Sequence, residues 1–294
     1  ADFRFVGNNS RYVIEGIRFI NFRDFDVDDA NCNFDCPDTD VIRLRYNEFR
    51  DGTSVHIRAK DAQQLTVTNN LFADLSPGGG SAVALSYVNN ESPPTIAFNT
   101  VAGILCSSGG DALYLFTQRS GVTLHHNLVQ QVGCVGNITV AGGSGGQPVA
   151  LRNNLYNTLA GLAPSVAIGN VVTNTPNFVN SGAGDYRLKE TAPASPAINA
   201  GMTPTEAATL GLSGQVPSQD LDGPAGARQI GTRYDIGAYE SSINDSSVLT
   251  VVNENDSGAG SLRAQIAAAN AAPGLQKIEF AIPGGCTQFP HLIL

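Results

Sequence analysis

Seven Asp residues crowd one short segment near the start of this sequence, and carboxylates at such spacing can bind a cation. Asp24-x-Asp26-x-Asp28, with Asp35 at the twelfth position, is the ligand spacing of a calcium-binding loop. The segment departs from that pattern at Asp29, where Gly is required, and at Asp35, where Glu is required. Two interpretations therefore stay open, a calcium site and a solvated acidic loop, and no other cofactor is indicated.

The sequence holds five cysteines, Cys32, Cys36, Cys106, Cys134 and Cys286. Their spacing matches no zinc site, because no second close Cys or His pair follows the first two. Disulfides explain them better. Cys32 and Cys36 could close a small ring in the acidic loop, whereas Cys286 has no evident partner.

Two further groups of titratable residues are expected to be structural. Neighbouring residues on a strand point to opposite faces, so His125 and His126 should not share a metal ion.

Asp220, Asp222 and Asp235 could hold a metal or form ion pairs with Arg228 and Arg233. Structural ion pairing is the preferred interpretation, since these residues belong to what looks like the end of a domain.

A recurring motif shows which elements must position these residues. An alternating strand is followed by Asn, any residue and an apolar residue, and the Asn positions are separated by 23, 29, 28 and 27 residues. The repeated Asn positions are 47, 70, 99, 127 and 154. Asn suits a bend because it tolerates left-handed backbone angles, and stacked Asn side chains can form a ladder.

This period is that of one coil of a parallel β-helix. Each motif has one apolar face, which it can bury only by stacking on its neighbours at about 4.8 Å. The sequence therefore predicts an all-β fold, a right-handed parallel β-helix with a short helix-containing capping segment. The alternative is an antiparallel sandwich with Asn turns, although its strands would recur every 8–12 residues or so.

The register also predicts one disulfide. Cys106 follows Asn99 by seven residues, and Cys134 follows Asn127 by the same interval. Stacked coils would bring the two Cα atoms to about 5 Å, within disulfide range. Stacked free thiols remain the alternative.

The segment 185–240 carries four motifs in order: Asp185-Tyr186-Arg187-Leu188, Ser195-Pro196-Ala197-Ile198-Asn199-Ala200-Gly201, Asp220-Leu221-Asp222-Gly223 and Asp235-Ile236-Gly237-Ala238-Tyr239-Glu240. This order resembles the C-terminal part of secreted bacterial β-helix proteins of the choice-of-anchor Q type, which are related to the pectin-lyase-like superfamily. The resemblance implies a closing segment of a β-helix, with Arg228 at a position where that family usually has Arg.

Residues 249–282 resemble the segment that opens a new β-helix domain in large tandem bacterial surface proteins. Ser261 can cap a helix with Leu262, Ile266 and Ala269 on one face, and an alternating strand follows. Such a helix would cover the open end of a coil stack.

Four segments result. Residues 1–176 are expected to form the coils, 177–240 the closing segment and 241–248 a linker. Residues 249–294 would open or cap a further β-helix domain or a neighbouring subunit. The chain would then be either a piece of a tandem protein or a subunit that binds further copies of itself end to end.

Composition narrows the partners. The net charge of −9 argues against nucleic acid, which needs a surplus of Lys and Arg. No apolar stretch is long enough to cross a bilayer, and the β-helix resemblance implies an extracellular or cell-surface protein.

Three functions compete. The first is a non-catalytic structural or adhesive protein, which would assemble head-to-tail into filaments through residues 249–294. The second is a polysaccharide lyase or glycoside hydrolase for acidic glycans, although no paired carboxylates or base with a calcium site are evident. The third is a carbohydrate-binding module, which the absence of Trp disfavours. The sequence identifies no glycan or host ligand.

Overall fold

The computed structural model describes most of the chain. The described residues are 1–6, 11–28, 41–59, 63–87, 92–107, 109–118, 120–142, 145–223, 226–243, 249–271 and 278–282.

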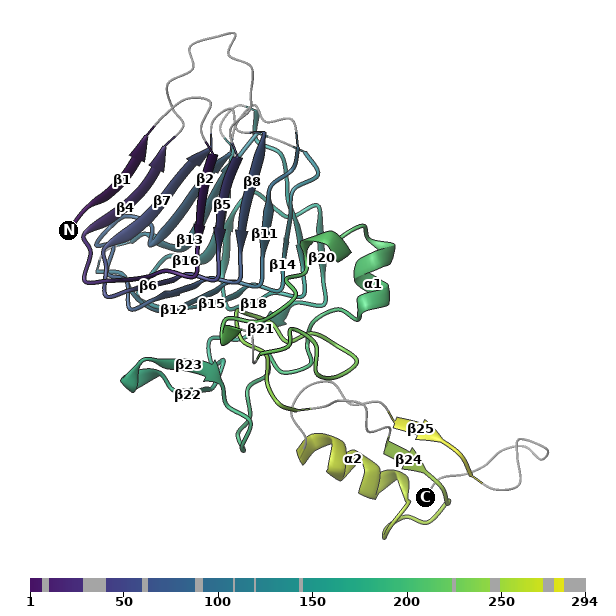
Figure 1. Ribbon diagram of the computed structural model, residues 1–294. Helices are drawn as coiled ribbons and strands as arrows, with labels where there is room; N and C mark the ends of the chain where they lie inside the picture. Colours follow the sequence, from purple (N-terminus) through teal and green to yellow (C-terminus); the bar gives the residue numbers. More distant parts are fainter. Residues whose placement is uncertain are drawn as a thin grey trace.

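Three seven-stranded parallel sheets stack into a β-helix, and the chain visits them in a fixed order (Figure 1). Sheet A contains β1 (Phe3–Val6), β4 (Asp24–Asp28), β7 (Ser54–Ala59), β10 (Val83–Tyr87), β13 (Asp111–Thr117), β16 (Gly136–Ala141) and β19 (Leu159–Gly161). Sheet B contains β2 (Arg11–Glu15), β5 (Val41–Arg45), β8 (Gln64–Thr68), β11 (Thr95–Ala97), β14 (Thr123–His125), β17 (Ala150–Arg152) and β20 (Val166–Ile168). Sheet C contains β3 (Arg18–Ile20), β6 (Glu48–Arg50), β9 (Leu71–Ala73), β12 (Thr100–Leu105), β15 (Leu128–Val132), β18 (Leu155–Tyr156) and β21 (Val171–Val172).

The predicted coil register is confirmed. Ile96 of β11 lies between Val67 of β8 and Leu124 of β14 in parallel pairing. Each sheet therefore adds one strand per coil, which excludes the antiparallel sandwich.

The Asn ladder lies inside the corner between sheets B and C. The Nδ2 group of each Asn donates to the Oδ1 atom of the next Asn, at 3.0–3.2 Å. The ladder contains the five predicted residues and one more, Asn170. Each of the five predicted Asn residues thus links its coil to the following one and is buried, whereas Asn170 ends the ladder and is partly exposed.

The left-handed residue of this corner is the one before the ladder Asn, which corrects the expectation that the Asn itself would adopt that conformation. These preceding residues have φ of 50–59° and are Tyr46, Asn69, Phe98, His126 and Asn153. The left-handed residue bends the chain from sheet B to sheet C. As a result the side chain of the ladder Asn points inward and the side chain of the preceding residue points outward. A row of large side chains consequently lines the outside of the corner.

The core fills the space between the three sheets. Alternate residues of each strand point inward, as in Phe25 and Val27 of β4 or Leu113 and Leu115 of β13, and these are buried. On sheet C, Phe49 stacks between Phe19 and Phe72 with ring centroids 5.0 and 5.1 Å apart. Stacked coils thereby place like side chains in contact along the axis.

The chain then leaves the stack through short elements. They are β22 (Phe178–Asn180), η2 (Ser181–Ala183), β23 (Asp185–Leu188), α1 (Pro204–Thr209) and η3 (Ser213–Gln215). Helix α1 begins with a capping box, in which Thr203 and Glu206 exchange hydrogen bonds, and Pro204 is its first residue.

The last described segment is a separate strand-helix-strand unit, formed by β24 (Leu249–Val251), α2 (Leu262–Ala271) and β25 (Ile278–Phe280). The two strands pair in parallel. Ser261 caps α2 by accepting a hydrogen bond from the Ala264 N–H group, as the sequence predicts. In Figure 1 this unit lies apart from the coils.

Candidate functional site

The closing segment, residues 177–240, lies against the outer face of sheet C. Leu71 and Ala73 of β9 point outward and pack against Tyr186 and Tyr239. Farther along the stack, Leu128 of β15 contacts the Ala197–Ile198 region. The middle strands of sheet C, β9 and β12, are therefore largely buried on both faces, which explains their nearly continuous apolar sequences.

The closing segment also covers the row of left-handed corner residues. The Asn153 amide donates to the Ala200 carbonyl at 3.0 Å, and the Asn69 amide donates to the Gln219 carbonyl at 3.3 Å. Phe98 packs against Met202 and other buried residues of the segment. The sequence does not reveal this role, because the residues before the ladder Asn share no side-chain type.

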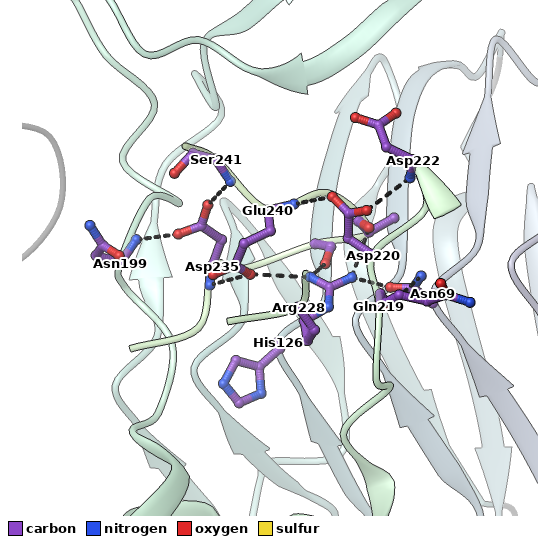
Figure 2. Close-up of polar contacts among 12 residues, drawn as sticks. Asn69, His126, Asn199, Gln219, Asp220, Asp222, Arg228, Asp235, Glu240 and Ser241 are labelled. Carbon is purple, nitrogen blue, oxygen red and sulfur yellow. Dashed lines mark hydrogen bonds and ion pairs between the residues drawn. The ribbon is translucent and has the colours of Figure 1, made fainter. Parts of the chain in front are cut away.

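Arg228 is the centre of the contact between the closing segment and the corner (Figure 2). Its guanidinium donates to the Asn69 side chain and to the carbonyls of Gly237 and Ala238, and it lies 4.7 Å from the centre of the Phe98 ring. The Arg228 side chain is 2% exposed, and its Nη1 atom is 3.6 Å from Glu240. One buried cation thus contacts both parts of the molecule.

Two buried carboxylates fold the closing segment around Arg228. Asp235 accepts hydrogen bonds from the N–H groups of Asn199 and Ser241, at 2.6 and 2.5 Å. Asp220 accepts from the N–H groups of Asp222 and Glu240, both at 3.0 Å. These bonds connect three of the four sequence motifs (Figure 2).

This arrangement differs from the predicted ion pairs. Arg228 is paired with Glu240, which the sequence analysis did not name as its partner, and Arg233 lies 3.5 Å from Glu206. Asp220 and Asp235 bind mainly backbone N–H groups instead. Hydrogen bonds within loops cannot be inferred from residue types alone.

Burial controls the protonation of this cluster. It raises the pKa of the Glu240 carboxyl to about 9, with a further contribution from the charge of Asp235. It also raises the pKa of the Asp235 carboxyl and lowers the pKa of the Arg228 guanidinium. Because these groups are sealed from solvent, they are placed to hold the fold rather than to contact a substrate.

His125 and His126 contact each other, so the prediction that they face opposite ways is wrong. The positive φ of His126, 55°, interrupts the alternation of the strand and brings the two Nδ1 atoms to 2.9 Å. Both rings are fully buried. Among the described residues they form no group with a third potential metal ligand.

The hydrogen bonds of the pair define its tautomers. The Met202 N–H group donates to His126 Nε2 at 2.8 Å, so His126 carries its proton on Nδ1 and donates it to His125. His125 then carries its proton on Nε2 and donates to Gln215 Oε1 at 3.0 Å. Burial lowers the pKa of His125 to about 4 and that of His126 well below its usual value.

The predicted disulfide joins Cys106 to Cys134, with the two Cα atoms 4.9 Å apart. It links neighbouring coils at the corner between sheets C and A. At this corner the backbone of Cys106 also forms an isolated parallel β-bridge with Gly78 of the preceding coil. Cys32, Cys36 and Cys286 lie outside the described residues.

The acidic residues of the predicted calcium loop that can be placed lie on a strand. Asp24, Asp26 and Asp28 occupy alternate, outward positions of β4. Asp24 accepts from the Ser54 hydroxyl and Asp28 lies 3.0 Å from Arg58.

Their placement on a loop was therefore wrong. His56 Nδ1 lies 3.4 Å from Asp26, so each of the three carboxylates has a neighbour on β7. Asp35 lies outside the described residues. Among the residues that are described, no three His, Cys, Asp or Glu side chains gather as a metal site, and calcium binding stays a prediction.

A polar groove lies over the outer face of sheet B, between the strands and the loop that follows η3. It has a volume of about 240 Å³. The strand side contributes Arg43, Arg45, Tyr46, Gln64, Thr66, Thr68 and Thr95, and the opposite side contributes residues 214–217 of η3 and the loop after it. The sequence does not reveal this groove, because its two walls are at least 119 residues apart along the chain.

No family model, curated protein or solved structure matches this chain. No helix in the described part of the chain is long and apolar enough to cross a membrane.

Proposed function

We propose that this protein is a non-catalytic structural or adhesive β-helix of the extracellular surface, which associates end to end through residues 249–294. The four motifs of the closing segment support a place among tandem bacterial surface proteins of the choice-of-anchor Q type, within the pectin-lyase-like superfamily. The partner is another copy of the chain or an adjacent domain of the same architecture.

Unpartnered apolar surface at two places is the observation that carries this proposal. At the first coil, Val13 and Ile17 are exposed, and β1, β2 and β3 have no partner beyond β4, β5 and β6 among the described residues. In the strand-helix-strand unit, Ile266 is 44% and Phe280 is 56% exposed. An edge coil offers free backbone groups, which a covering helix or an added strand would satisfy.

The buried titratable groups support a non-catalytic role. His125, His126 and Glu240 have strongly shifted pKa values, which can mark a catalytic site. Here each of them bonds to the protein itself and is enclosed by the closing segment. Their shifts follow from burial, and they hold that segment on the coils.

The disulfide supports an extracellular location. Bonds such as Cys106–Cys134 persist in oxidising compartments and are rare where glutathione keeps thiols reduced. The bond joins two coils whose cysteines are 28 residues apart.

Association can be tested with charged substitutions in the full chain. Ile266→Asp and Phe280→Asp place a carboxylate on the exposed apolar surface of the terminal unit. We expect the wild-type protein to form linear assemblies in electron micrographs and to show concentration-dependent mass by light scattering. The two variants should remain single particles of one chain mass.

Leu105→Asp is the matched control, since Leu105 is equally exposed at 57% but lies on β12, three coils away from the first one. It should assemble as the wild type does. Single particles of the wild-type protein at every concentration would contradict end-to-end association between copies. Depolymerisation of a uronate polysaccharide, with or without calcium, would contradict the non-catalytic part.

A further inference from the structure

The groove over sheet B has the chemistry of a binding site for an anionic ligand. Arg43 and Arg45 are two residues apart on β5, so both side chains point outward from the same face. The groove-lining residues include two guanidinium groups and no carboxylate. This is a local positive site on a chain whose net charge is −9.

Arg43 is available to a ligand. Its guanidinium donates to the neutral Gln64 side chain at 2.8 Å, and no carboxylate of the described residues lies within ion-pair distance of it. Arg45, in contrast, is paired with Glu15 at 2.6 Å. A planar guanidinium without a carboxylate partner suits bidentate binding of a ligand carboxylate.

The other lining groups suit a ligand that carries hydroxyls. Thr66 and Thr95 lie side by side on adjacent strands, and Thr68 and Gln64 extend the polar floor. Strands about 4.8 Å apart present such donors and acceptors at roughly the spacing of the substituents on one sugar ring. The volume of about 240 Å³ suits a single ring rather than a folded partner.

The wall opposite the strands is held in place. Gln215 lines the groove, and its Oε1 atom accepts the hydrogen bond from His125 described above. The buried histidine pair thereby fixes the loop against sheet B. A wall that is ordered before binding reduces the entropy that a small ligand must overcome.

We infer that this groove binds one sugar residue bearing a carboxylate, with Arg43 binding the carboxylate and the threonine hydroxyls binding the ring. The inference rests on the proposed adhesive function, for which it names the ligand class. A nucleic acid is disfavoured because its many phosphates need a larger basic surface. An extended peptide is disfavoured because the lining offers little apolar area for its side chains.

Calorimetric titration of the full chain provides the test. The probes are methyl glucuronide and methyl galacturonide, with the corresponding neutral glycosides, acetate and an acidic peptide as comparisons. We expect only the two uronides to bind measurably. Arg43→Gln should weaken their binding about tenfold or more, which corresponds to the loss of one charge-assisted contact.

Arg152→Gln is the matched control, because Arg152 lies on β17 of the same sheet but outside this groove. Its affinity for the uronides should equal that of the wild type, and both variants should unfold at the wild-type urea concentration. Equal binding of neutral glycosides or of acetate, binding of the peptide alone, or an unchanged Arg43→Gln affinity would each overturn the inference.

The same samples separate this inference from the proposed function. If the protein binds uronides but never assembles, the inferred sugar site is supported and the proposed end-to-end contact is rejected. Assembly without uronide binding would reject the groove as a sugar site and leave the structural proposal unaffected.

Discussion

The side chain of Asn99 uses its full hydrogen-bonding capacity within the corner. Its Nδ2 group donates to the Val67 carbonyl and to Asn127, at 2.8 and 3.0 Å. Its Oδ1 atom accepts from the backbone and side-chain N–H groups of Asn70, at 3.1 and 3.0 Å. Removing this side chain would take buried hydrogen-bond partners from Val67 and Asn70 in the preceding coil and from Asn127 in the following one.

We therefore predict that Asn99→Ala lowers the free energy of unfolding by about 3 kcal/mol, because each buried polar group left unsatisfied costs about 1–3 kcal/mol. Urea denaturation monitored by circular dichroism measures this change. Asn255→Ala, at an exposed position, should change the free energy by about 0.5 kcal/mol or less. A loss below 1 kcal/mol for Asn99→Ala would mean that the ladder is not structurally important.

The sequence predicts the ladder but not the corner residues beside it. Asn47 to Asn154 share one residue type and one period, so the repeat identifies them directly. The left-handed positions carry Tyr46, Phe98 and His126, which have no type in common. Their shared backbone conformation follows from the turn geometry, which sequence patterns do not show.

At the scale of elements, the closing segment depends on one cation. Arg228 contacts Asn69 and Phe98 of the coils, and its pairing with Glu240 orders the end of the segment. Replacing Arg228 by an apolar residue would leave the Asn69 side chain and the carbonyls of Gly237 and Ala238 without their donor, and each buried polar group left unsatisfied costs about 1–3 kcal/mol.

Arg228→Met is thus expected to destabilise the fold by about 3–5 kcal/mol and to make the closing segment susceptible to proteolysis. Limited trypsin digestion with mass spectrometry locates the cleavage sites, and urea denaturation gives the free energy. Arg187→Met is the control, because Arg187 forms an exposed pair with Asp185 that should contribute 1 kcal/mol or so at most. Wild-type resistance of Arg228→Met to trypsin would show that apolar packing alone holds the segment.

The elements were predicted to different extents. The Ser261 cap of α2 was predicted from local spacing, as was the Cys106–Cys134 bond. The position of residues 177–240 on sheet C was not, since contacts such as Arg228 with Asn69 join residues 159 apart. Long-range packing of irregular loops leaves no periodic signal.

For the whole molecule, two sets of buried groups oppose each other in the dependence of stability on pH. The folded pKa of His125 is about 4, below its ordinary 6.5, so this histidine destabilises the fold as the pH falls from 6.5 to 4. His126 acts in the same direction. The folded pKa of Glu240 is about 9, above its ordinary 4.5, so its contribution is lost as the pH rises from 4.5 to 9.

Below pH 6.5, protonation of the two histidines destabilises the fold more than protonation of Glu240 stabilises it. Above pH 6.5 only the ionisation of Glu240 remains, and it destabilises the fold as the pH rises. The free energy of unfolding should therefore be largest near pH 6.5. Urea denaturation at unit pH intervals from 4 to 9 should show the maximum. In Glu240→Gln, the free energy of unfolding should decrease less between pH 6.5 and 9, and its decrease between pH 6.5 and 4 should be unchanged. An unchanged alkaline decline in Glu240→Gln would refute this assignment.

The route of the closing segment has a mechanical consequence. Stacked repeats generally fray from an end, because each unit touches only its neighbours. Here the chain doubles back after its last coil and runs alongside earlier ones, reaching Arg50 of β6 through the Gly184 carbonyl. Because the closing segment contacts several coils, unfolding of one coil disrupts contacts that stabilise the others. The coils should therefore unfold together in one cooperative transition.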